Sequence, residues 1–253
     1  MNLTGFNTLL YKEILRFGKV WLQTVAAPVI NGVLFLTVFG HVLGNRAPSF
    51  TGVDYTAFLI PGLMMMSVIQ NAFANTSSSL IQSKVAGNIV FLLVAPLSHV
   101  EFFAAFVAAA VVRGLMVGAG VFVIALWLIP VSFHNVGVIL LFALLGAALL
   151  GAVGMIAGIW AQKFDQLAGV QNFVILPLSF LSGVFYSLQG LPPLWRELSH
   201  LNPFFYLVDG FRYGFFGVSD VSPWLSFGVT ALSFLAVSAA ALWILRTGYK
   251  LRD

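Results

Sequence analysis

The chain of 253 residues contains no cysteine, and only 8% of its residues are charged. Without cysteine it can form neither a disulfide framework nor a thiolate metal site. A soluble domain usually carries roughly 25% charged residues, because polar groups must cover its surface. With 60% hydrophobic residues and a mean hydropathy of +1.00, this chain has too few polar residues for that covering. The composition therefore predicts an all-α domain, residues 1–253, embedded in a lipid bilayer as a helical bundle.

Sequence patterns of catalysis and nucleotide binding are also missing. Four histidines are present, His41, His99, His134 and His200, and none of them has a carboxylate four residues away, so no metal-ligand spacing is recognised. The Walker A pattern is absent, since Gly18-Lys19 is followed by Val20 where Ser or Thr would bind magnesium. We therefore expect no catalysis and no bound cofactor in this chain; if ATP and magnesium are used, a separate subunit must bind them. The small net charge of +4, without a dense Lys/Arg run, also argues against nucleic acid as a partner.

Six apolar stretches are long enough to cross roughly 30 Å of hydrocarbon, which takes about 20 helical residues. They are Trp21–Leu43, Tyr55–Asn75, Phe102–Leu128, Val136–Ala161, Leu167–Leu188 and Trp224–Leu245. An even number of spans puts both termini on the same side of the membrane. That side holds Lys12, Arg16, Lys19, Lys84, Lys163, Arg246, Lys250 and Arg252, whereas the other side holds Arg46, Arg196 and Arg212. The positive-inside rule therefore predicts cytoplasmic termini and, for a bacterial chain, a place in the inner membrane.

The residues before the first span, 1–20, form a separate element. Apolar side chains recur at helical spacing at Leu3, Phe6, Leu9, Leu10, Ile14, Phe17 and Val20. The charged side chains Lys12, Glu13, Arg16 and Lys19 fall largely away from that stripe. The pattern predicts an amphipathic helix lying in the membrane interface, either as a functional part or as an inert anchor.

The segment 76–100, between the second and third spans, contains the apolar run Ile89–Ser98, which is too short to cross a bilayer. We expect a short cytoplasmic helix that stops at Pro96. An apolar segment on the aqueous side needs a surface against which it can be buried. This segment therefore indicates a cytoplasmic partner.

The segment 189–223, between the fifth and sixth spans, is the longest outer loop. It begins with Gly190-Leu191-Pro192-Pro193 and continues into the aromatic run Phe204–Gly217. Asp209 and Arg212 are three residues apart in that run, so they could pair on a helix. We expect one or two short re-entrant helices that dip into the outer leaflet without crossing, covered by protein or a cavity.

Several residues inside the spans are candidates for a pathway. Arg113 is the one full charge well inside a span, and it faces either an anionic substrate head group or a structural partner. Pro28, Pro61 and Pro177 permit kinks, and Gln70 and Asn71 suit either a pathway wall or ordinary interhelical hydrogen bonds. Three Gly-x-x-x-Gly pairs begin at Gly114, Gly154 and Gly210, and packing within one bundle is their simplest interpretation.

Three longer patterns occur in a fixed order. The first is Phe180–Tyr186 followed by Leu191-Pro192-Pro193, Leu201-Asn202-Pro203 and Gly210–Gly214; the others are Tyr55–Met66 around Pro61-Gly62, and Leu92–Ser98. In these patterns and in the order of its parts, nearly the whole chain resembles the membrane subunit of type-2 ABC exporters, and within that class the YadH-like branch. The class includes O-antigen, teichoic-acid, Nod-factor and drug-efflux permeases.

The resemblance implies a homodimer of six-span subunits that carries two cytoplasmic ABC ATPase subunits. It implies a coupling helix at roughly Ser79–Leu93, with Ser83, Lys84, Asn88, Val90, Phe91, Leu92 and Leu93 as candidate ATPase contacts. The candidates for the pathway or its outer gate are Pro61, Gln70, Asn71, Arg113, Pro177, Tyr186, Asp209 and Arg212. Members of the family usually carry acidic residues just before the Leu-Leu pair, whereas Val90 and Phe91 stand there in this chain. The docking contact is then more apolar here, or the partner differs.

The hypothesis favoured by the sequence is an ATP-driven exporter permease for an amphipathic or lipid-like molecule: a lipid-linked glycan, a lipid or a hydrophobic drug. A secondary transporter or channel is the alternative, although that class commonly carries several ionisable groups in its spans. A membrane enzyme acting on lipid is disfavoured because acid/base and metal constellations are missing. The sequence leaves open whether the second permease of the dimer is the same chain.

Overall fold

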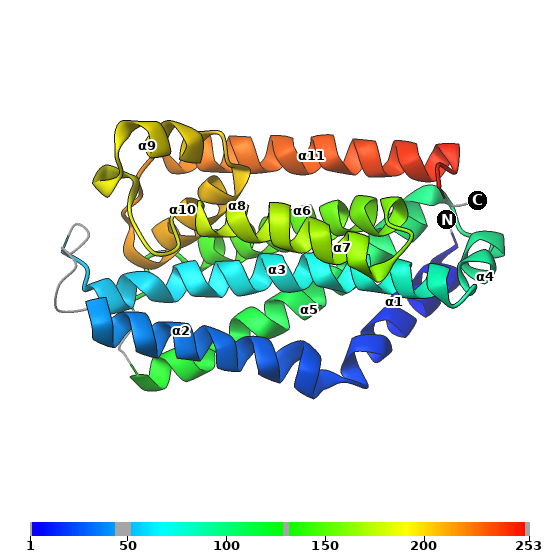
Figure 1. Cartoon of the computed structure of the whole chain (residues 1–253), viewed down its shortest axis with the longest axis horizontal. Coiled ribbons are helices and arrows are strands. Elements are labelled where there is room, and N and C mark those ends of the chain that lie inside the picture. The colour runs from blue at the N-terminus through cyan, green and yellow to red at the C-terminus, as the bar shows by residue number, and fades with distance from the viewer. Residues whose placement is uncertain (1, 44–51, 129–131, 251–253) are drawn as a thin grey trace.

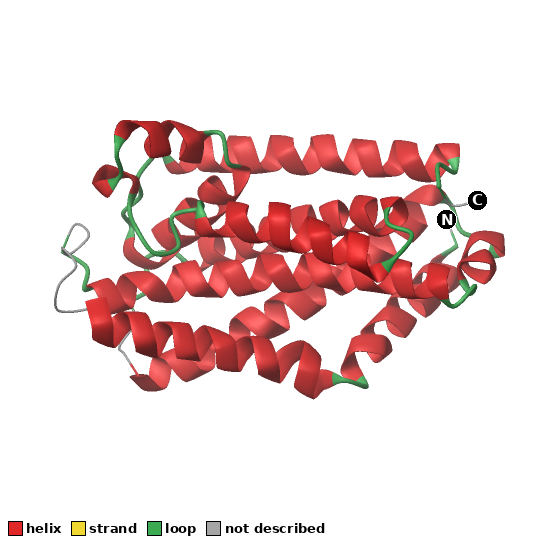
Figure 2. Cartoon of the chain, in the orientation of Figure 1, coloured by secondary structure: helices red, strands yellow, loops and turns green. Residues whose placement is uncertain are grey.

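The computed structural model describes residues 2–43, 52–128 and 132–250. Figure 2 shows that these residues form helices joined by loops, in agreement with the predicted all-α class. The helices are α1 Leu3–Gly18, α2 Ala27–Leu43, α3 Tyr55–Val85, α4 Ile89–Val94, α5 His99–Leu128, α6 Val136–Trp160, α7 Phe164–Val170, α8 Leu176–Phe180, α9 Pro193–His200, α10 Pro203–Phe216 and α11 Pro223–Thr247. Two π turns, η1 Leu22–Ala26 and η2 Gln171–Ile175, and a 3₁₀ turn, η3 Leu188–Gly190, complete the set.

The long helix α3 lies at the centre of the bundle and packs against α2, α5, α6 and α10. The start of α1, the end of α11 and the short helix α4 gather at one end of the molecule, hereafter the α4 end (Figure 1). Helices α9 and α10 and the start of α11 lie toward the opposite end, hereafter the α9 end (Figure 1). The side of the membrane that the α4 end faces stays a prediction. Arg46 and Arg252, which were counted for the orientation, lie outside the described residues.

In the described part of the chain, five helical runs are long and apolar enough to cross a membrane: Leu22–Val42, Tyr55–Val85, His99–Trp127, Val136–Trp160 and Pro223–Thr247. They coincide with five of the six predicted spans. The expected span Leu167–Leu188 is instead a shorter helical run, built from α7, η2 and α8, that ends at Phe180. Beyond it the chain turns through Gly183, whose φ of +76° lies in the left-handed region that favours glycine.

The second predicted span continues well beyond its expected end at Asn75. Helix α3 extends to Val85, so its 31 residues measure about 46 Å, more than the thickness of the hydrocarbon core. The second half of α3 is largely buried, because glycines on α6 allow the two helices to pack closely. A Cβ at Gly154 would lie 2.5 Å from the backbone oxygen of Phe73. The first ten residues of the predicted segment 76–100 therefore belong to α3, and the separate helix in that segment is the six-residue α4.

The three Gly-x-x-x-Gly pairs pack inside the bundle, as predicted. Gly114 and Gly118 face α3, and Gly154 and Gly158 also face α3. Gly210 and Gly214 lie against α6, where a Cβ at Gly210 would approach the Phe142 ring to 2.1 Å. Small residues thus bring helices together where lipid supplies no hydrophobic driving force for association.

Helix α1 is confirmed as a helix, but its charged face differs from the prediction. Glu13 is fully buried, in line with Leu9 and Phe17, and not on the polar side. Its carboxylate accepts hydrogen bonds from Lys12, Arg16 and Ser79, the last at 2.8 Å from α3. A buried carboxylate needs such partners, and they fix α1 against α3.

The two π turns stand next to the prolines of the first and fifth predicted spans. Each ends two residues before a proline: η1 ends at Ala26 before Pro28, and η2 ends at Ile175 before Pro177. Proline has no N–H for the helix ladder, and its ring collides with the carbonyl four residues earlier. A wider turn relieves that collision, so the predicted irregularities at Pro28 and Pro177 take the form of π turns. At Pro61, by contrast, α3 is continuous.

Two exposed tryptophan side chains stand near the two ends of α11. Trp224 and Trp243 are both exposed and lie nineteen residues apart on this helix, about 28 Å along its axis. That distance matches the roughly 30 Å of hydrocarbon between two interfaces, where tryptophan is enriched.

Candidate functional site

A hollow of about 220 Å³ lies between α2, α3 and η2. Its polar lining residues are Asn31, Ser67, Gln70, Asn71 and Gln171, and its apolar ones include Phe35, Leu63 and Met66. Pro28, which follows the first π turn, and Gln171, which begins the second, both line it. π turns occur frequently at functional sites, so two broken helices facing one polar hollow make this the candidate binding site. Of the predicted pathway residues, Gln70 and Asn71 line it.

Arg113 lies behind the wall of this hollow. It is 7% exposed, and its guanidinium group donates a hydrogen bond to Asn71 Oδ1 at 3.1 Å. Asn71 Nδ2 in turn donates to the backbone oxygen of Ser67 at 3.0 Å. The charge of Arg113 therefore faces protein, and Asn71 connects it with the hollow.

The predicted residues Pro61, Pro177 and Tyr186 do not line the hollow. Pro61 precedes Gly62, where a Cβ would lie 2.8 Å from the backbone oxygen of Val184. The segment 181–187, which includes Tyr186, therefore packs directly on α3 near the α9 end. Tyr55 at the start of α3 fastens the same segment by donating its hydroxyl to the backbone oxygen of Phe185 at 3.1 Å.

Asp209 and Arg212 are both fully buried on α10, but each has its own partners. Asp209 accepts hydrogen bonds from the backbone N–H of Asp220 at 2.7 Å and from Ser226 Oγ at 3.2 Å. Arg212 donates to the backbone oxygen of Gly183 at 2.6 Å, and its guanidinium carbon lies 3.8 Å from the centre of the Phe58 ring. Among the described residues, ion pairs within 4 Å join only Glu13 to Lys12 and Arg16. The predicted pair of Asp209 and Arg212 is therefore wrong; the two residues bind separate loops to α10.

Asp220 is a polar anchor that the sequence analysis missed. Its carboxylate accepts hydrogen bonds from Ser187 Oγ at 2.5 Å and from the backbone N–H of Leu188 at 3.3 Å. Together with Asp209 it ties the loop before α11 to the segment before α9. At the α9 end, hydrogen bonds thus join α10, the loop before α11 and the segment before α9. No spacing in the sequence points to Asp220, because its partners lie more than thirty residues earlier.

Helix α4 presents an apolar face at the α4 end of the molecule. Ile89 is buried and Leu92 is partly buried, so these two residues anchor the helix. Val90, Phe91, Leu93 and Val94 are exposed, and Phe91 and Val94 each show 78% of their surface. We call these four residues the α4 apolar face. In water such a cluster is expected to bind another surface.

A groove of about 490 Å³ runs between α1 and α4 beside this face. Its lining residues are Lys12, Arg16, Gln82, Ser83, Ala86, Asn88, Phe91 and Leu92. The predicted coupling residues Ser83, Asn88, Phe91 and Leu92 are therefore brought together here. Lys84 points elsewhere: its ammonium group donates to the backbone oxygens of Ile159 and Ala161, the latter at 3.1 Å, at the C-terminal end of α6. A cation stabilises a helix C-terminus, so Lys84 in this position stabilises the end of α6.

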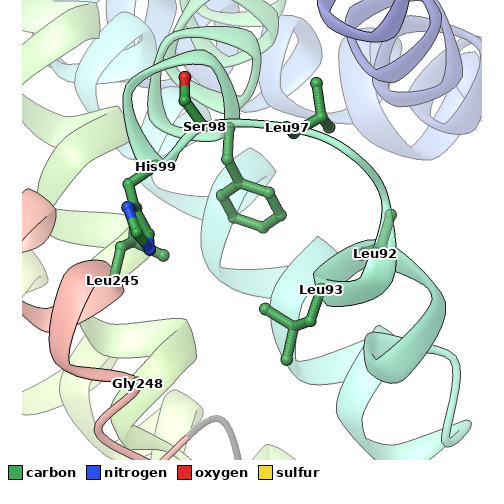
Figure 3. Close-up of a pocket in the computed structure, with 8 residues that line it drawn as sticks. Leu92, Leu93, Leu97, Ser98, His99, Leu245 and Gly248 are labelled. Carbon is green, nitrogen blue, oxygen red and sulfur yellow. The ribbon is translucent and has the colours of Figure 1, made fainter.

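On its other side, α4 borders a second hollow, of about 220 Å³, shown in Figure 3. Leu92, Leu93 and Leu97 lie on one side of it, and Leu245 and Gly248 at the end of α11 lie on the other (Figure 3). Helix α4 therefore stands between two hollows and is held mainly through Ile89 and Leu92.

Glu101 fixes the point at which the segment after α4 enters α5. Glu101 Oε2 accepts from the backbone N–H of Ser98 at 2.8 Å, and Ser98 Oγ accepts from the N–H of Glu101 at 3.2 Å. These reciprocal bonds form a capping box. The second carboxylate oxygen accepts from the backbone N–H of Asn2, so the starts of α1 and α5 meet at Glu101. The sequence analysis missed this box, although Ser98-x-x-Glu101 was its signal.

Comparison with known proteins gives a consistent result. The family described as ABC-2 type transporter matches residues 4–216. The chain is 42% identical over 242 residues to the inner membrane transport permease YadH of Escherichia coli strain K12, covering 96% of this chain and 94% of that protein. It is 24% identical over 241 residues to nodulation protein J of Rhizobium leguminosarum bv. viciae, covering 93% and 91%. In Sinorhizobium fredii, nodulation protein J is 27% identical over 206 residues, covering 79% and 77%.

The family match spans most of the chain, and the YadH relative is similar over nearly all of it. Membrane-spanning helices account for the apolar composition. The predicted likeness to type-2 ABC permeases of the YadH branch is therefore confirmed, and this chain belongs to the ABC-2 type transporter family.

Proposed function

We propose that this chain is the membrane permease of an ATP-driven exporter and carries an amphipathic, lipid-like molecule out of the bacterial cytoplasm or the inner leaflet. Two separate cytoplasmic ABC ATPase subunits would bind and hydrolyse ATP with magnesium, and a second copy of this permease would complete the complex. The YadH relative is named an inner membrane transport permease, which supports transport across that membrane. The substrate class is our inference from the apolar and amide-lined hollow.

The α4 apolar face is the observation that carries this proposal. Lys and Arg are most numerous among the residues predicted for the α4 end of the bundle, which supports our inference from the positive-inside rule that it faces the cytoplasm. A face with Phe91 and Val94 nearly fully exposed to water calls for a protein surface that covers it. An ATPase subunit docked on α4 and in the groove between α1 and α4 would provide that surface. Ser83, Asn88, Phe91 and Leu92 would then be coupling residues.

We further propose that the run from Phe164 to Phe180, together with the turning segment up to Leu188, makes the sixth crossing. The run leads from the α4 end back toward the α9 end (Figure 1). Its seventeen helical residues measure about 25 Å, somewhat less than the hydrocarbon thickness. Helices α9 and α10 would then be the re-entrant elements that close the exit. The aromatic and glycine-rich sequence of α10, buried against α3, α6 and α11, supports this placement.

The pathway we propose follows α2, α3 and η2. These elements surround the polar hollow, and they correspond to the first, second and fifth predicted spans. ATP binding would press on α4, and α1 would transmit the movement to α3 through Arg16 and Glu13. A helix with a π turn beside a proline is a natural place for such a wall to bend.

Replacement of Phe91 by Glu tests the proposal most directly. The permease should be co-expressed with the ATPase encoded beside its gene, purified and reconstituted in nanodiscs. We expect Phe91→Glu to abolish co-purification of the ATPase and the vanadate-sensitive ATP hydrolysis, while the permease keeps its thermal stability. The α4 apolar face is exposed, so the substitution leaves the core intact.

The matched control is Leu201→Glu, which makes the same kind of change at an exposed leucine of the α9 end. This variant should retain the ATPase. If the wild-type chain never captures an ATPase, or if transport continues unchanged without ATP, the permease proposal is wrong. Dependence of the reconstituted flux on an ion gradient would then favour a secondary transporter.

A further inference from the structure

We propose that the hollow between α2, α3 and η2 binds the head group of the transported molecule, and that this head group is an oxyanion such as a phosphate or a carboxylate. The inference rests on the transport function proposed above and adds the chemistry of its substrate. Three observations support the proposal: the hollow itself, the buried donors near it that lack partners, and the charge of Arg113.

Buried nitrogen donors on α3 and α5 near the hollow lack acceptors among the described residues. Four buried side-chain atoms on this stretch of α3 and on α5 have no hydrogen-bond partner among the described residues: Gln70 Nε2, Asn75 Nδ2, Thr76 Oγ1 and Arg113 Nε. Three of the four are N–H groups, which can only donate. A buried donor without an acceptor is costly, so a ligand rich in acceptor oxygens would stabilise this region. Gln70 is also one of the residues that line the hollow, so its buried Nε2 lies close behind the wall.

The charge near the hollow is positive. The guanidinium group of Arg113 remains protonated in proteins, and the one partner described for it is the neutral oxygen of Asn71. Arg16 is paired with Glu13, whereas Arg113 has no carboxylate within 4 Å among the described residues. Neither aspartate nor glutamate is among the residues that line the hollow. A cationic head group would therefore meet repulsion here, whereas an oxyanion would be attracted.

Asn71 connects Arg113 with the hollow, because it accepts a hydrogen bond from Arg113 and also lines the hollow. Its side-chain oxygen accepts the hydrogen bond from Arg113, and one N–H of its amide donates a hydrogen bond to the backbone oxygen of Ser67. The second amide hydrogen is left for a ligand, and the bond from a charged donor polarises the amide and strengthens that donation. Gln70 and Asn71 both line the hollow, so an oxyanion bound there would lie close to the amide groups of both residues.

The shape of the hollow suits a head group whose tail remains in lipid. A volume of about 220 Å³ has room for a small polar group but not for a whole lipid. Phe35 lies on the lining and is also exposed on the outer face of α2. The hollow therefore opens toward the side of the molecule where an acyl chain would lie in the bilayer.

A cysteine-protection experiment tests the proposal, because the chain has no native cysteine. Ala74 lines the hollow, so Ala74→Cys in the full chain reports on its occupancy. The variant is placed in phosphatidylcholine nanodiscs, and its alkylation by a membrane-permeant maleimide is timed with dodecyl phosphate, dodecyltrimethylammonium or dodecanol present. We expect dodecyl phosphate to slow the alkylation about tenfold and the other two probes to leave it nearly unchanged. Thr37→Cys, on the exposed face of α2, is the control site and should show no protection.

The donors are tested in the Ala74→Cys background by Gln70→Met, which keeps the length of the side chain and removes its N–H groups. We expect about tenfold more dodecyl phosphate to be needed for half-protection. Equal protection by the phosphate and the ammonium probe, or protection that Gln70→Met leaves unchanged, would overturn the oxyanion site. The permease function would survive either result, because co-purification of the ATPase and vanadate-sensitive hydrolysis measure it independently.

Discussion

The guanidinium group of Arg16 on α1 donates two hydrogen bonds to Asn75 on α3, one to the backbone oxygen at 2.8 Å and one to Oδ1 at 3.0 Å. Arg16 also contacts Glu13 Oε2 at 3.1 Å, so one side chain joins a buried carboxylate to the middle of α3. Asn75 lies one turn from Asn71, which lines the polar hollow. Arg16, Glu13 and Asn75 therefore form a polar network on α1 and α3 that ends one helical turn from the candidate binding site.

Replacement of Arg16 by Met should loosen this network. The buried carboxylate of Glu13 would lose its Arg16 partner, and we expect the free energy of unfolding to fall by about 2 kcal/mol. Thermal unfolding of the purified permease measures the loss, with the exposed Lys19→Met as control. Because the two side chains act as a unit, adding Glu13→Gln should recover part of the loss. Strictly additive losses would show that the pair is not coupled.

Lys84 should prove structural and not a coupling residue. Lys84→Met removes the cation at the C-terminal end of α6, so we expect a loss of about 1 kcal/mol in stability. The ATPase should nevertheless co-purify with the variant as it does with wild type, in contrast to Phe91→Glu. Loss of the ATPase from a stable Lys84→Met protein would restore Lys84 to the coupling contact.

Arg212 and Phe58 should be energetically coupled. The planar guanidinium group lies 3.8 Å from the ring centre in a fully buried site, where a cation–π contact contributes about 2 kcal/mol. Arg212→Lys keeps the charge but loses the planar stacking. A double-mutant cycle with Phe58→Leu, read by thermal unfolding, should give a coupling energy of about 1 kcal/mol or more. A coupling energy near zero would contradict the stacking.

Gly210 should tolerate no side chain. In Gly210→Ala the new Cβ would meet the Phe142 ring at 2.1 Å, and overpacking of this kind costs about 1–3 kcal/mol. Combining it with Phe142→Leu should cost less than the sum of the two single losses, because the smaller side chain makes room. Gly228→Ala is the control: nothing lies within 4 Å of its Cβ position on α11, so its stability should stay the same or rise slightly. A benign Gly210→Ala would contradict the close approach of α10 and α6.

Ser98 should stabilise the start of α5. Ser98→Ala removes one of the two reciprocal bonds with Glu101, and we expect a loss of about 1 kcal/mol in thermal unfolding. Ser98→Thr keeps a capping hydroxyl and should behave nearly as wild type. Equal losses in both variants would point to packing against Leu97 or His99, and the capping box would then not be the cause.

Five of the six spans could be predicted from the sequence because hydropathy is a property of a whole window of residues, and no tertiary contact is needed to read it. The helix contacts at the Gly-x-x-x-Gly pairs could also be predicted, since close packing of helices in lipid requires small residues. The hollow was foreseen only in part. Gln70 and Asn71 stood out as polar residues in a span, whereas Asn31, Ser67 and Gln171 join them only in the folded bundle.

Several residues have partners that are distant in the sequence. Glu13 looked like part of a solvated face, but Ser79 reaches it from 66 residues away. Lys84, a candidate contact to the ATPase, bonds to the end of α6 more than 70 residues later. Asp209 and Arg212 are near enough along α10 to suggest a pair, but each is bound by a different loop. Local spacing predicts local pairs, and only the packing of the bundle selects among them.

Each π turn also changes the direction in which its helix faces. A π turn takes one residue more than an α turn, so the side chains after it are rotated by about 100° relative to an unbroken helix. The stripe of residues that faces lipid before Leu22 or Gln171 is therefore not the stripe that faces lipid after Ala26 or Ile175. A molecule that moves along either helix would therefore not contact one continuous stripe of side chains. At the π turn it would leave the side chains of one stripe and meet those of another.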